Sequence, residues 1–290
     1  YDFAGRATER TALAERWKDA VAARPGLVVV SGEPGIGKTR LVAEVAAGVH
    51  DAGGTVLYGR SEEELDVAFR PWAEALGHLV AHAPDGLVRT HVDEWGGDLG
   101  RLLPGLDAPE PPRTDADTER LRLFGAVTDL LARAGDDAPV LVVLDDLHWA
   151  DESSLLLLRH LVRNLGDARV LVVGTYRDTD LDRTHPLAAA LADLRREASV
   201  ARVDLSGLDR DEVTLFLTQA GGGDVDAAQV EVLAGMVAAE TEGNPFFIGE
   251  VLVHLVESGA LVQRDGRWEG DRTLIERIGL PEGIREVIGR

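Results

Sequence analysis

The stretch Gly32-Glu-Pro-Gly-Ile-Gly-Lys-Thr39 decides the fold, because it matches the phosphate-loop pattern G-x-x-x-x-G-K-[ST]. It follows the apolar run LVVV at 27–30 and precedes the amphipathic run TRLVAEVAAGV at 39–49. A strand, a glycine-rich turn and a helix in this order form the context that the motif requires. The glycines let successive backbone N–H groups curl around phosphate oxygens, and the following helix offers its N-terminus to negative charge. The stretch therefore predicts a nucleotide phosphate site.

Two side chains of this motif have specific tasks. We expect Lys38 to reach the β- and γ-phosphates as a catalytic group, and the Thr39 hydroxyl to ligate Mg²⁺. The chain contains only two lysines, and one of them occupies the position that the motif requires. The predicted nucleotide-binding residues of this stretch are Gly32, Glu33, Pro34, Gly35, Ile36, Gly37, Lys38, Thr39 and Arg40.

Around the motif, short β-branched runs alternate with helical stretches. The predicted strands are 27–30, 56–58, 140–144, 170–175 and 201–205. The candidate helices lie near 7–23, 38–50, 71–82, 116–134, 152–165 and 186–197. The runs PVLVVL at 139–144 and ARVLVVG at 168–174 are typical of central parallel strands that are covered on both faces. The alternation predicts an α/β fold, a P-loop NTPase with a five-stranded parallel sheet sandwiched by helices.

Strand signals end near residue 206, which is the predicted domain boundary. Residues 84–118 are rich in proline, glycine and aspartate, so we expect a partly irregular surface insertion there. Beyond the boundary, 209–220 and 228–258 look helical, and 261–275 fits a polar hairpin around Asp265-Gly266. The predicted domains are a nucleotide-binding domain at 1–205, a small helical lid domain at 206–280 and the start of a further domain at 281–290.

Composition narrows the class of protein. The 290 residues suffice for about two domains, and no apolar run is long enough to span a bilayer. The net charge of −21 argues against binding of a nucleic-acid backbone over a large surface of the chain. DNA binding is therefore expected only through a domain outside this chain. The lack of cysteine excludes disulfides and thiolate metal sites and fits a reducing, cytoplasmic location. Because Arg290 falls inside a helix-like run, we expect the chain to be a piece of a longer protein.

The run VLVVLDD at 140–146 provides the acidic group that a phosphate loop needs. A buried strand that ends in two aspartates places Asp145 at its tip, where it can hold Mg²⁺ directly or through water. Asp146 is then placed to orient or deprotonate the attacking water, a catalytic role. The alternative for both residues is a turn-forming aspartate at a strand end.

Four further residues lie near these strands. Asp151 fits the N-cap of the next helix, accepting from the backbone of one of the following serines. His148 is interpreted as an orienting or packing residue and Trp149 as a core residue. Arg177 follows the strand beside the Asp-Asp strand, where a guanidinium can touch the γ-phosphate and report its presence, a catalytic role. The alternative for Arg177 is a solvated arginine at a strand end.

Other classes of phosphate-loop protein fit less well. A GTPase needs an Asn-Lys-x-Asp motif, and no lysine follows Lys38. An ABC ATPase needs its LSGGQ-like signature before the aspartate-ending strand, whereas the similar residues Leu205-Ser-Gly207 come after it. A small-molecule kinase stays open, although it gives no reason for the helical C-terminal region. The expected cofactors are therefore ATP or ADP and Mg²⁺.

Six stretches occur in the order found in one known family. They are FAGR at 3–6, GEPGIGKTRL at 32–41, ERLRLF at 119–124, VLDDLHWADESSLLLLRHL at 143–161, GTYRD at 174–178 and EGNPFF at 242–247. With them the chain resembles the ATPase module of the large LuxR-type (LAL) transcriptional regulators of actinobacteria. These regulators belong to the signal-transduction ATPases with numerous domains (STAND), which are AAA-like P-loop NTPases. The resemblance covers nearly the whole chain, and similar modules are also fused to kinase or cyclase domains.

The resemblance implies a five-stranded nucleotide-binding domain, a helical lid and then a winged-helix domain, which 281–290 would begin. It implies that Gly5 and Arg6 line the adenine pocket, that Arg177 is the sensor arginine and that Pro245 packs on adenine. Such modules are switches in which ADP holds the lid closed and ATP permits self-association. Hydrolysis then resets them.

The stretch TEGNPFFIGE at 241–250 is interpreted locally as a joint between two helices. Gly243 can end the first helix, Asn244 can cap the second, and Pro245 fits its first turn. The two adjacent phenylalanines are expected to be core anchors. By the resemblance, the same joint faces the nucleotide.

Two other functions stay open. One is an AAA-type hydrolytic remodelling ATPase, whose turnover would be fast and stimulated by its substrate. The other is a module that holds nucleotide as a structural ligand and hydrolyses nothing. Many relatives in the resembled family carry glutamate where Asp146 stands, and the shorter carboxylate suits a slow regulatory ATPase better than a motor. The expected partners are nucleotide and, in the ATP state, a second copy of the chain.

Overall fold

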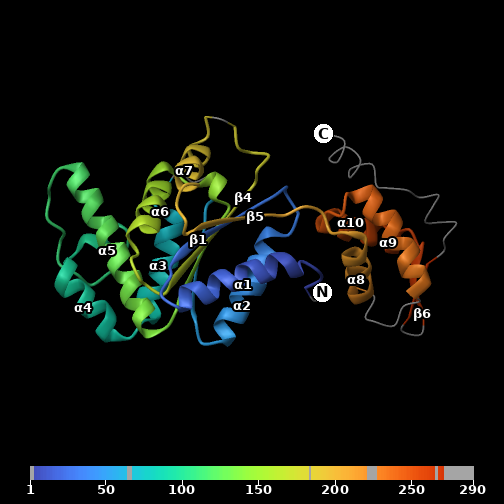
Figure 1. The fold of residues 1–290 in the computed structure, drawn as a ribbon, viewed down its shortest axis with the longest axis horizontal. Coiled ribbons are helices and arrows are strands. Elements are labelled where there is room, and N and C mark those ends of the chain that lie inside the picture. The colour runs from blue at the N-terminus through green and yellow to red at the C-terminus, as the bar shows by residue number, and fades with distance from the viewer. Residues whose placement is uncertain (1–2, 64–66, 183, 221–226, 265–266, 271–290) are drawn as a thin grey trace. The chain divides into compact units, whose positions relative to one another are not determined.

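The computed structural model describes residues 3–63, 67–182, 184–220, 227–264 and 267–270 (Figure 1). Its internal contacts divide the chain into two compact units. The lid unit consists of Tyr1–Glu9, Glu33–Lys38 and Leu205–Arg290, and the sheet unit consists of Arg10–Gly32 and Thr39–Asp204. Most of the phosphate loop therefore groups with the C-terminal helices rather than with the strand that precedes it.

The sheet unit is built on five parallel strands. They are β1 (Gly26–Ser31), β2 (Thr55–Arg60), β3 (Val140–Asp145), β4 (Val170–Tyr176) and β5 (Val200–Asp204). Their order in the sheet is β2-β3-β4-β1-β5. Every residue of β3 and β4 is buried, as expected for central strands with both faces covered. The predicted α/β P-loop fold is confirmed, since all five strands lie where the sequence predicts them.

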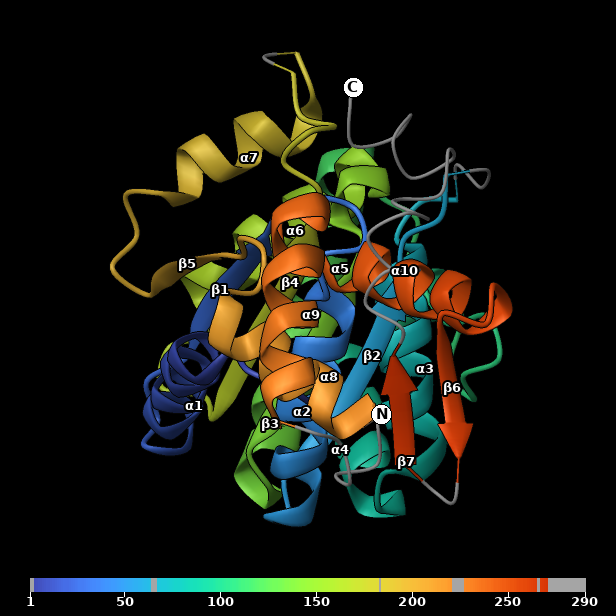
Figure 2. The ribbon, with the colours of Figure 1, turned by 90° about the vertical axis from the view of Figure 1, so that its right-hand side faces the viewer.

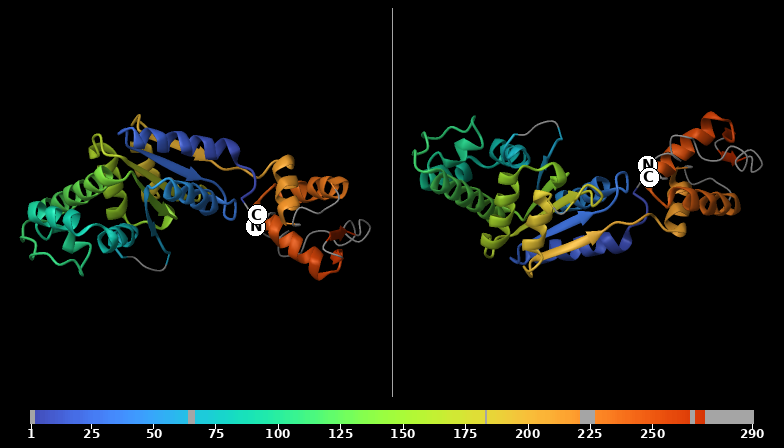
Figure 3. Two further views of the ribbon diagram at one scale, coloured as in Figure 1. Left: turned by 90° about the horizontal axis from the view of Figure 1, so that it is seen from below. Right: turned by 90° about the horizontal axis from the view of Figure 1, so that it is seen from above.

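Helices connect the strands and flank the sheet (Figure 3). They are α1 (Ala7–Val21), α2 (Lys38–Asp51), α3 (Arg70–His82), α4 (Asp85–Trp95), α5 (Ala116–Asp137), α6 (Glu152–Asn164) and α7 (Pro186–Leu194), with 3-10 turns η1 (Asp98–Arg101) and η2 (Leu147–Trp149). Side chains of α3, α5, α6 and α7 share one apolar core with alternate residues of β1, β3 and β4. This core holds the strand ends at fixed positions.

The strand register brings polar residues together at one edge of the sheet. Strand β2 pairs with β3 so that Arg60 lies opposite Asp145. Strand β3 pairs with β4 so that Leu144 lies opposite Gly174. Because the carboxyl ends of parallel strands meet at the same edge, the residues that follow β3 lie between the ends of β2 and β4.

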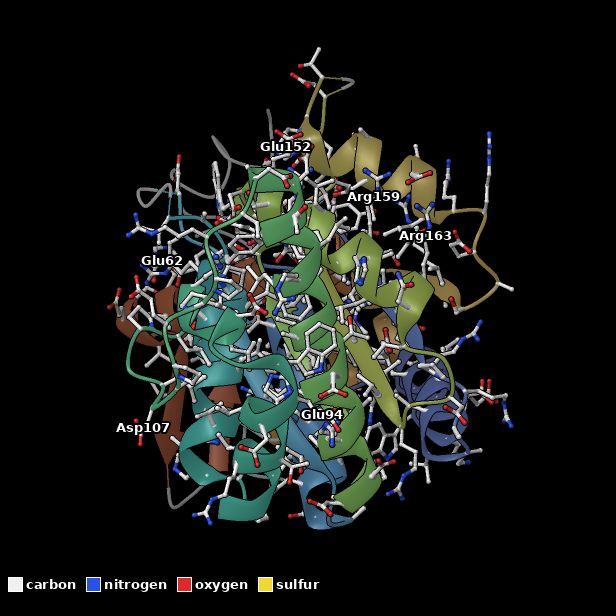
Figure 4. The ribbon with its side chains drawn as sticks, turned by 90° about the vertical axis from the view of Figure 1, so that its left-hand side faces the viewer. Glu62, Glu94, Asp107, Glu152, Arg159 and Arg163 are labelled. Carbon is white, nitrogen blue, oxygen red and sulfur yellow. The ribbon has the colours of Figure 1, made fainter. Side chains whose placement is uncertain are left out.

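Ion pairs join α6 to α7 across the surface of the sheet unit (Figure 4). Arg159 pairs with Asp193, and Arg163 lies 3.1 Å from Asp193 and 2.9 Å from Glu197. Half-exposed pairs of this kind each contribute about 0–1 kcal/mol. The contact between the two helices therefore depends mainly on their leucines in the shared core.

The predicted, partly irregular insertion at 84–118 contains α4 and η1, with irregular chain between η1 and α5. His91 of α4 is buried, stacks on Trp95 with ring centroids 6.5 Å apart, and has Nδ1 2.9 Å from Asp129 of α5. Burial lowers the pKa of His91 below its usual value. Pro84 precedes α4 as its N-cap instead of interrupting it, so the proline-rich composition conceals a helix.

Two predictions about the segment after β3 have different outcomes. Trp149 is half-buried rather than a core residue, because it ends η2 close to the surface. The N-cap interpretation of Asp151 is confirmed, since its carboxylate accepts from the backbone N–H of Ser154 at 3.0 Å. The same carboxylate accepts from the backbone N–H of Phe69 at 3.0 Å and thereby fixes the start of α3.

The described part of the lid unit packs three helices and a hairpin around its own apolar core (Figure 2). The elements are α8 (Arg210–Ala220), α9 (Ala227–Thr241), α10 (Pro245–Glu257), β6 (Leu261–Arg264) and β7 (Arg267–Gly270). The core residues include Val213, Leu217, Ala234, Ile248 and Val251. Antiparallel pairing of β6 with β7 confirms the strands of the predicted hairpin.

The joint between α9 and α10 has the predicted local form. Gly243 follows α9 with φ 70°, Asn244 caps α10 by accepting from the N–H of Phe246 at 3.1 Å, and Pro245 is the first helical residue. Phe246, however, is 56% exposed, so the prediction that it anchors the core is wrong. The proline starts the helix in an orientation that leaves Phe246 outside the core, whereas Phe247 packs against it.

Two predicted features lie outside the described residues, namely the turn Asp265-Gly266 and the segment 281–290. The boundaries of the predicted domains stay predictions. Along the described chain, no helix is long and apolar enough to cross a membrane.

Candidate functional site

The phosphate loop Glu33–Lys38 lies in the lid unit. Ile36 and Lys38 are buried, whereas Glu33, Pro34 and Gly35 are exposed. Lys38 donates from Nζ to the carbonyl of Glu33 at 2.9 Å, across the turn of the loop. Helix α2 begins at Lys38, so the loop leads into a helix N-terminus, as the motif requires.

The N-terminal segment contacts this loop through Arg6. The guanidinium of Arg6 donates to the carbonyl of Ile36 at 3.2 Å and lies 3.2 Å from Glu9. Arg6 itself is 4% exposed and has a left-handed backbone with φ 60°. Its backbone N–H donates to Oε1 of Glu212 at 2.5 Å. Arg6 therefore links the start of α8 to the loop. Gly5 is the residue before Arg6 and belongs to the same contact.

The joint of the lid helices also meets the loop within this unit. Nδ2 of Asn244 donates to the carbonyl of Pro34 at 3.0 Å. A Cβ placed on Gly37 would lie 4.0 Å from Cγ of Pro245, which is ordinary van der Waals contact. The lid unit therefore brings the predicted residues Gly5, Arg6 and Pro245 to the phosphate loop.

In the sheet unit, the two predicted magnesium ligands are adjacent. The Thr39 hydroxyl lies 3.0 Å and 3.2 Å from the two carboxylate oxygens of Asp145. The hydroxyls of Thr175 and Tyr58 donate to the same carboxylate at 2.5 Å and 3.0 Å. Asp145 is 2% exposed, so these hydroxyls satisfy a buried charge and fix its orientation.

Tyr58 keeps its proton at this carboxylate. Burial and the neighbouring charge of Asp145 raise the pKa of Tyr58 well above its usual value. The phenol therefore stays a hydrogen-bond donor across the whole physiological pH range.

Asp146 is held by contacts on both its backbone and its side chain. Its backbone is left-handed with φ 58°, and its N–H donates to the Thr175 hydroxyl at 3.0 Å. Its carboxylate accepts from Nε and Nη2 of Arg60 at 3.1 Å and 3.0 Å. The hydrogen bonds that Arg60 donates to Asp146 raise the pKa of Arg60. This forked pair connects the end of β2 to the residue after β3.

A row of charged and titratable groups continues from Asp146 to Arg177. His148, which is buried, has Nδ1 4.0 Å from Asp146 and Nε2 3.7 Å from Asp180. Nη1 of Arg177 lies 3.7 Å from the same Asp180 carboxylate. These separations exceed hydrogen-bond distances. Arg177 directly follows β4, as predicted, while Gly32 follows β1 and Arg40 is exposed on α2.

The oxygen ligands at Thr39 and Asp145 fit Mg²⁺. Among the described residues, no group of three or more His, Cys, Asp or Glu side chains could hold a metal ion. Mg²⁺ in nucleotide sites typically takes one or two protein oxygens and completes its shell with phosphates and waters. A hydroxyl and a carboxylate side by side therefore suit that cation.

Sequence reasoning missed three residues of this site, namely Tyr58, Arg60 and Thr175. None belongs to the phosphate-loop motif or to the acidic run. Tyr58 and Arg60 meet the aspartates only because β2 lies next to β3 in the sheet. Thr175 has a weaker signal, since it is a polar residue near the end of a predicted strand, two residues before Arg177.

Comparison with known proteins gives one family match. Residues 2–173 match the family model described as "AAA ATPase domain". An uncharacterised protein of Rhizobium meliloti (strain 1021) is 26% identical over 211 residues, which cover 65% of this chain and 20% of that protein. The chain thus spans about a fifth of the length of this curated relative.

Three solved structures match most of this chain at low sequence identity. A STAND protein of Pyrococcus horikoshii with a tetratricopeptide repeat sensor is 16% identical with a TM-score of 0.49, over 98% of this chain and 32% of that one. A Thermotoga maritima RuvB variant is 13% identical with a TM-score of 0.48, over 98% and 70% of the two chains. The replication initiator DnaA, solved with AMPPCP and single-stranded DNA, is 13% identical with a TM-score of 0.46, over 89% and 63%.

Proposed function

This chain belongs to the AAA ATPase domain family, and we propose that it is the nucleotide-controlled switch of a larger regulatory protein. It binds ATP or ADP with Mg²⁺ and hydrolyses ATP slowly. The observation that carries this proposal is the grouping of loop residues 33–38 with the lid helices in one compact unit. A ligand on this loop acts directly on the lid, as a switch requires.

The loop and the strand edge have separate tasks in this mechanism. Backbone N–H groups of the loop and the ammonium of Lys38 bind the β- and γ-phosphates. Thr39 and Asp145 hold Mg²⁺, which when bound neutralises charge on the phosphates. Asp146 orients the attacking water and accepts its proton, and the products are ADP and phosphate. Arg177 contacts the γ-phosphate and so differs in its contacts between the ATP and ADP states.

Slow turnover follows from how Asp146 is held. Oδ2 of its carboxylate accepts two hydrogen bonds from Arg60, so this oxygen is already occupied when the attacking water arrives. The same restraint fits an ATPase that hydrolyses slowly, as a regulatory switch does, better than one that cycles rapidly, as a motor does. A remodelling AAA ATPase stays the second candidate, supported by the family match alone.

The wider role is that of a transcriptional regulator of the LuxR (LAL) type, as the motif order from FAGR to EGNPFF implies. The sensor and the effector lie outside this chain, and a kinase or cyclase is the alternative effector. With a net charge of −21, the chain itself is poorly suited to DNA. Self-association in the ATP state transmits the signal.

The experiment that tests nucleotide binding compares the two lysines of the chain. Saturation with ADP–Mg²⁺ at about 100 times Kd stabilises a folded protein by roughly 2.7 kcal/mol, which raises Tm by several degrees. We expect this shift in the wild type and in Lys18→Ala, because Lys18 lies in the last turn of α1. We expect Lys38→Ala to abolish it. An undiminished shift in Lys38→Ala would overturn the site assignment.

A second measurement separates the switch from a motor. Steady-state phosphate release and light scattering are recorded with ADP and with ATP. A switch turns over slowly and changes its oligomeric state with the nucleotide. Fast turnover with an unchanged oligomeric state would instead support the remodelling ATPase.

A further inference from the structure

We propose that Asn244 and Glu212 of the lid unit hold the phosphate loop in its nucleotide-binding shape, so that nucleotide affinity and the capping of α8 and α10 are coupled. The inference rests on the proposed function and adds its regulation. Neither residue needs to touch the nucleotide, because each acts on the outer side of the loop. Both are positioning residues.

Asn244 makes two different hydrogen bonds with one side chain. Oδ1 accepts from the N–H of Phe246 and caps α10, while Nδ2 donates to the carbonyl of Pro34. The terminal amide of asparagine carries an acceptor oxygen and a separate donor nitrogen, so one side chain can make both bonds. Asparagine is also short enough for an N-cap. Asn244 itself is 3% exposed, so its side chain is shielded from bulk water at its end of each bond.

Glu212 likewise accepts different hydrogen bonds with its two carboxylate oxygens. Oε2 accepts from the N–H of Asp209 at 3.0 Å, and Oδ1 of Asp209 accepts from the N–H of Glu212 at 2.9 Å. This reciprocal pair is a capping box at the start of α8. The other oxygen accepts from the N–H of Arg6, whose guanidinium donates to the carbonyl of Ile36. A second helix start is thereby connected to the loop.

The two connections act on alternate carbonyls of the loop. When backbone N–H groups of a phosphate loop point inward to the phosphates, its carbonyls point outward and need other donors. The carbonyls of Pro34 and Ile36 have such donors from the lid unit. A loop that is already ordered before binding does not lose conformational entropy when the nucleotide binds. The affinity of the loop for the nucleotide is therefore higher.

Close packing around Gly35 supports the coupling. A Cβ on Gly35 would lie 2.7 Å from Cβ of Phe246 and 3.1 Å from Oδ1 of Asn244. A Cβ on Gly5 would similarly lie 2.6 Å from the Glu212 carboxylate. At Gly35 the nearest atoms belong to Asn244 and the first turn of α10, so the loop and that helix start are in direct contact. By reciprocity, a nucleotide that orders the loop must also strengthen both caps.

The test replaces the donor of Asn244 while keeping its cap. Serine caps helices about as well as asparagine but cannot also donate to a distant carbonyl, so Asn244→Ser should leave the nucleotide-free Tm nearly unchanged. Its affinity for ADP–Mg²⁺, measured by titration calorimetry, should fall about fivefold, the effect of losing one hydrogen bond. In turnover assays KM for ATP should rise while kcat stays close to the wild-type value.

Glu212→Gln provides an independent variant. Glutamine can keep the capping box with Asp209, but one carbonyl oxygen replaces the two carboxylate oxygens that serve the box and Arg6. ADP affinity should again fall a few-fold. The matched control is Asp115→Ala, which removes the N-cap of α5 in the sheet unit. That variant should lower Tm and leave ADP affinity unchanged.

The outcomes separate this inference from the function on which it rests. Wild-type binding of ADP by both Asn244→Ser and Glu212→Gln, together with loss of binding in Lys38→Ala, would overturn the coupling and leave the nucleotide site standing. Affinity that falls only in proportion to Tm, as in a merely structural role, would also overturn it. A wild-type chain that binds no ADP would overturn both.

Discussion

At the scale of single residues, the proposed chemistry depends most on Asp146. Its left-handed backbone costs about 1–2 kcal/mol for a residue other than glycine. Thr175 and Arg60 offset that cost by binding its N–H and its carboxylate. The conformation directs the carboxylate to the end of β2, where the forked pair restrains it. Arg60 therefore occupies one of the two carboxylate oxygens of Asp146.

Removing Arg60 should accelerate hydrolysis. In Arg60→Ala, Oδ2 of Asp146 loses its two hydrogen bonds from Arg60 and can contact the attacking water, so kcat for ATP should rise about threefold. The affinity for ADP should not change, since neither residue belongs to the phosphate loop. Steady-state phosphate release measures the effect. Arg60→Lys is the matched control, because it keeps the charge without the fork and should give an intermediate rate. A clear fall in kcat would show that Arg60 orients the base rather than restraining it.

At the scale of helices and strands, the elements that could be predicted are those that their own residues specify. The five strands are β-branched runs, and the glycines before Lys38 require a turn whatever the rest of the chain does. Asn244 and Pro245 likewise specify a helix start through their own chemistry. These elements need no knowledge of tertiary contacts.

Elements decided by tertiary contacts could not be predicted. Arg60 and Tyr58 are strand residues without a motif, and only the sheet order places them beside the aspartates. The burial of Phe246 was predicted from its type alone, although its position in the first turn of α10 leaves it exposed. Helix α4 was concealed because prolines surround it.

The α4–α5 contact should make stability depend on pH through His91. Burial lowers its folded pKa below the ordinary value of 6.5. As pH falls through 6.5, the unfolded chain takes up a proton that the folded chain does not, so the free energy of unfolding decreases. His91→Gln should flatten urea-measured stability between about pH 7 and pH 5. His50→Gln, at an exposed site on α2, should retain the wild-type slope. An identical slope in His91→Gln and the wild type would contradict this origin.

At the scale of the whole molecule, the proposed switch depends on which unit contains the phosphate loop. The phosphate loop lies in sequence between β1 and α2 but groups by contact with α8, α9 and α10. When a nucleotide orders the phosphate loop, the change therefore takes place within the lid unit. The sheet unit contributes the carboxylates and the restraint by Arg60. In the proposed switch, the lid unit would therefore respond to nucleotide binding and the sheet unit would set the rate of hydrolysis.

The most direct test of this account is hydrogen–deuterium exchange at the first turn of α10, with and without saturating ADP–Mg²⁺. If the loop and the lid caps are coupled, the amide of Phe246, which donates to Asn244, should exchange several-fold more slowly with nucleotide. Lys38→Ala should show no such protection. Unchanged exchange at this amide in a wild-type chain that is saturated with ADP–Mg²⁺ would contradict the central claim.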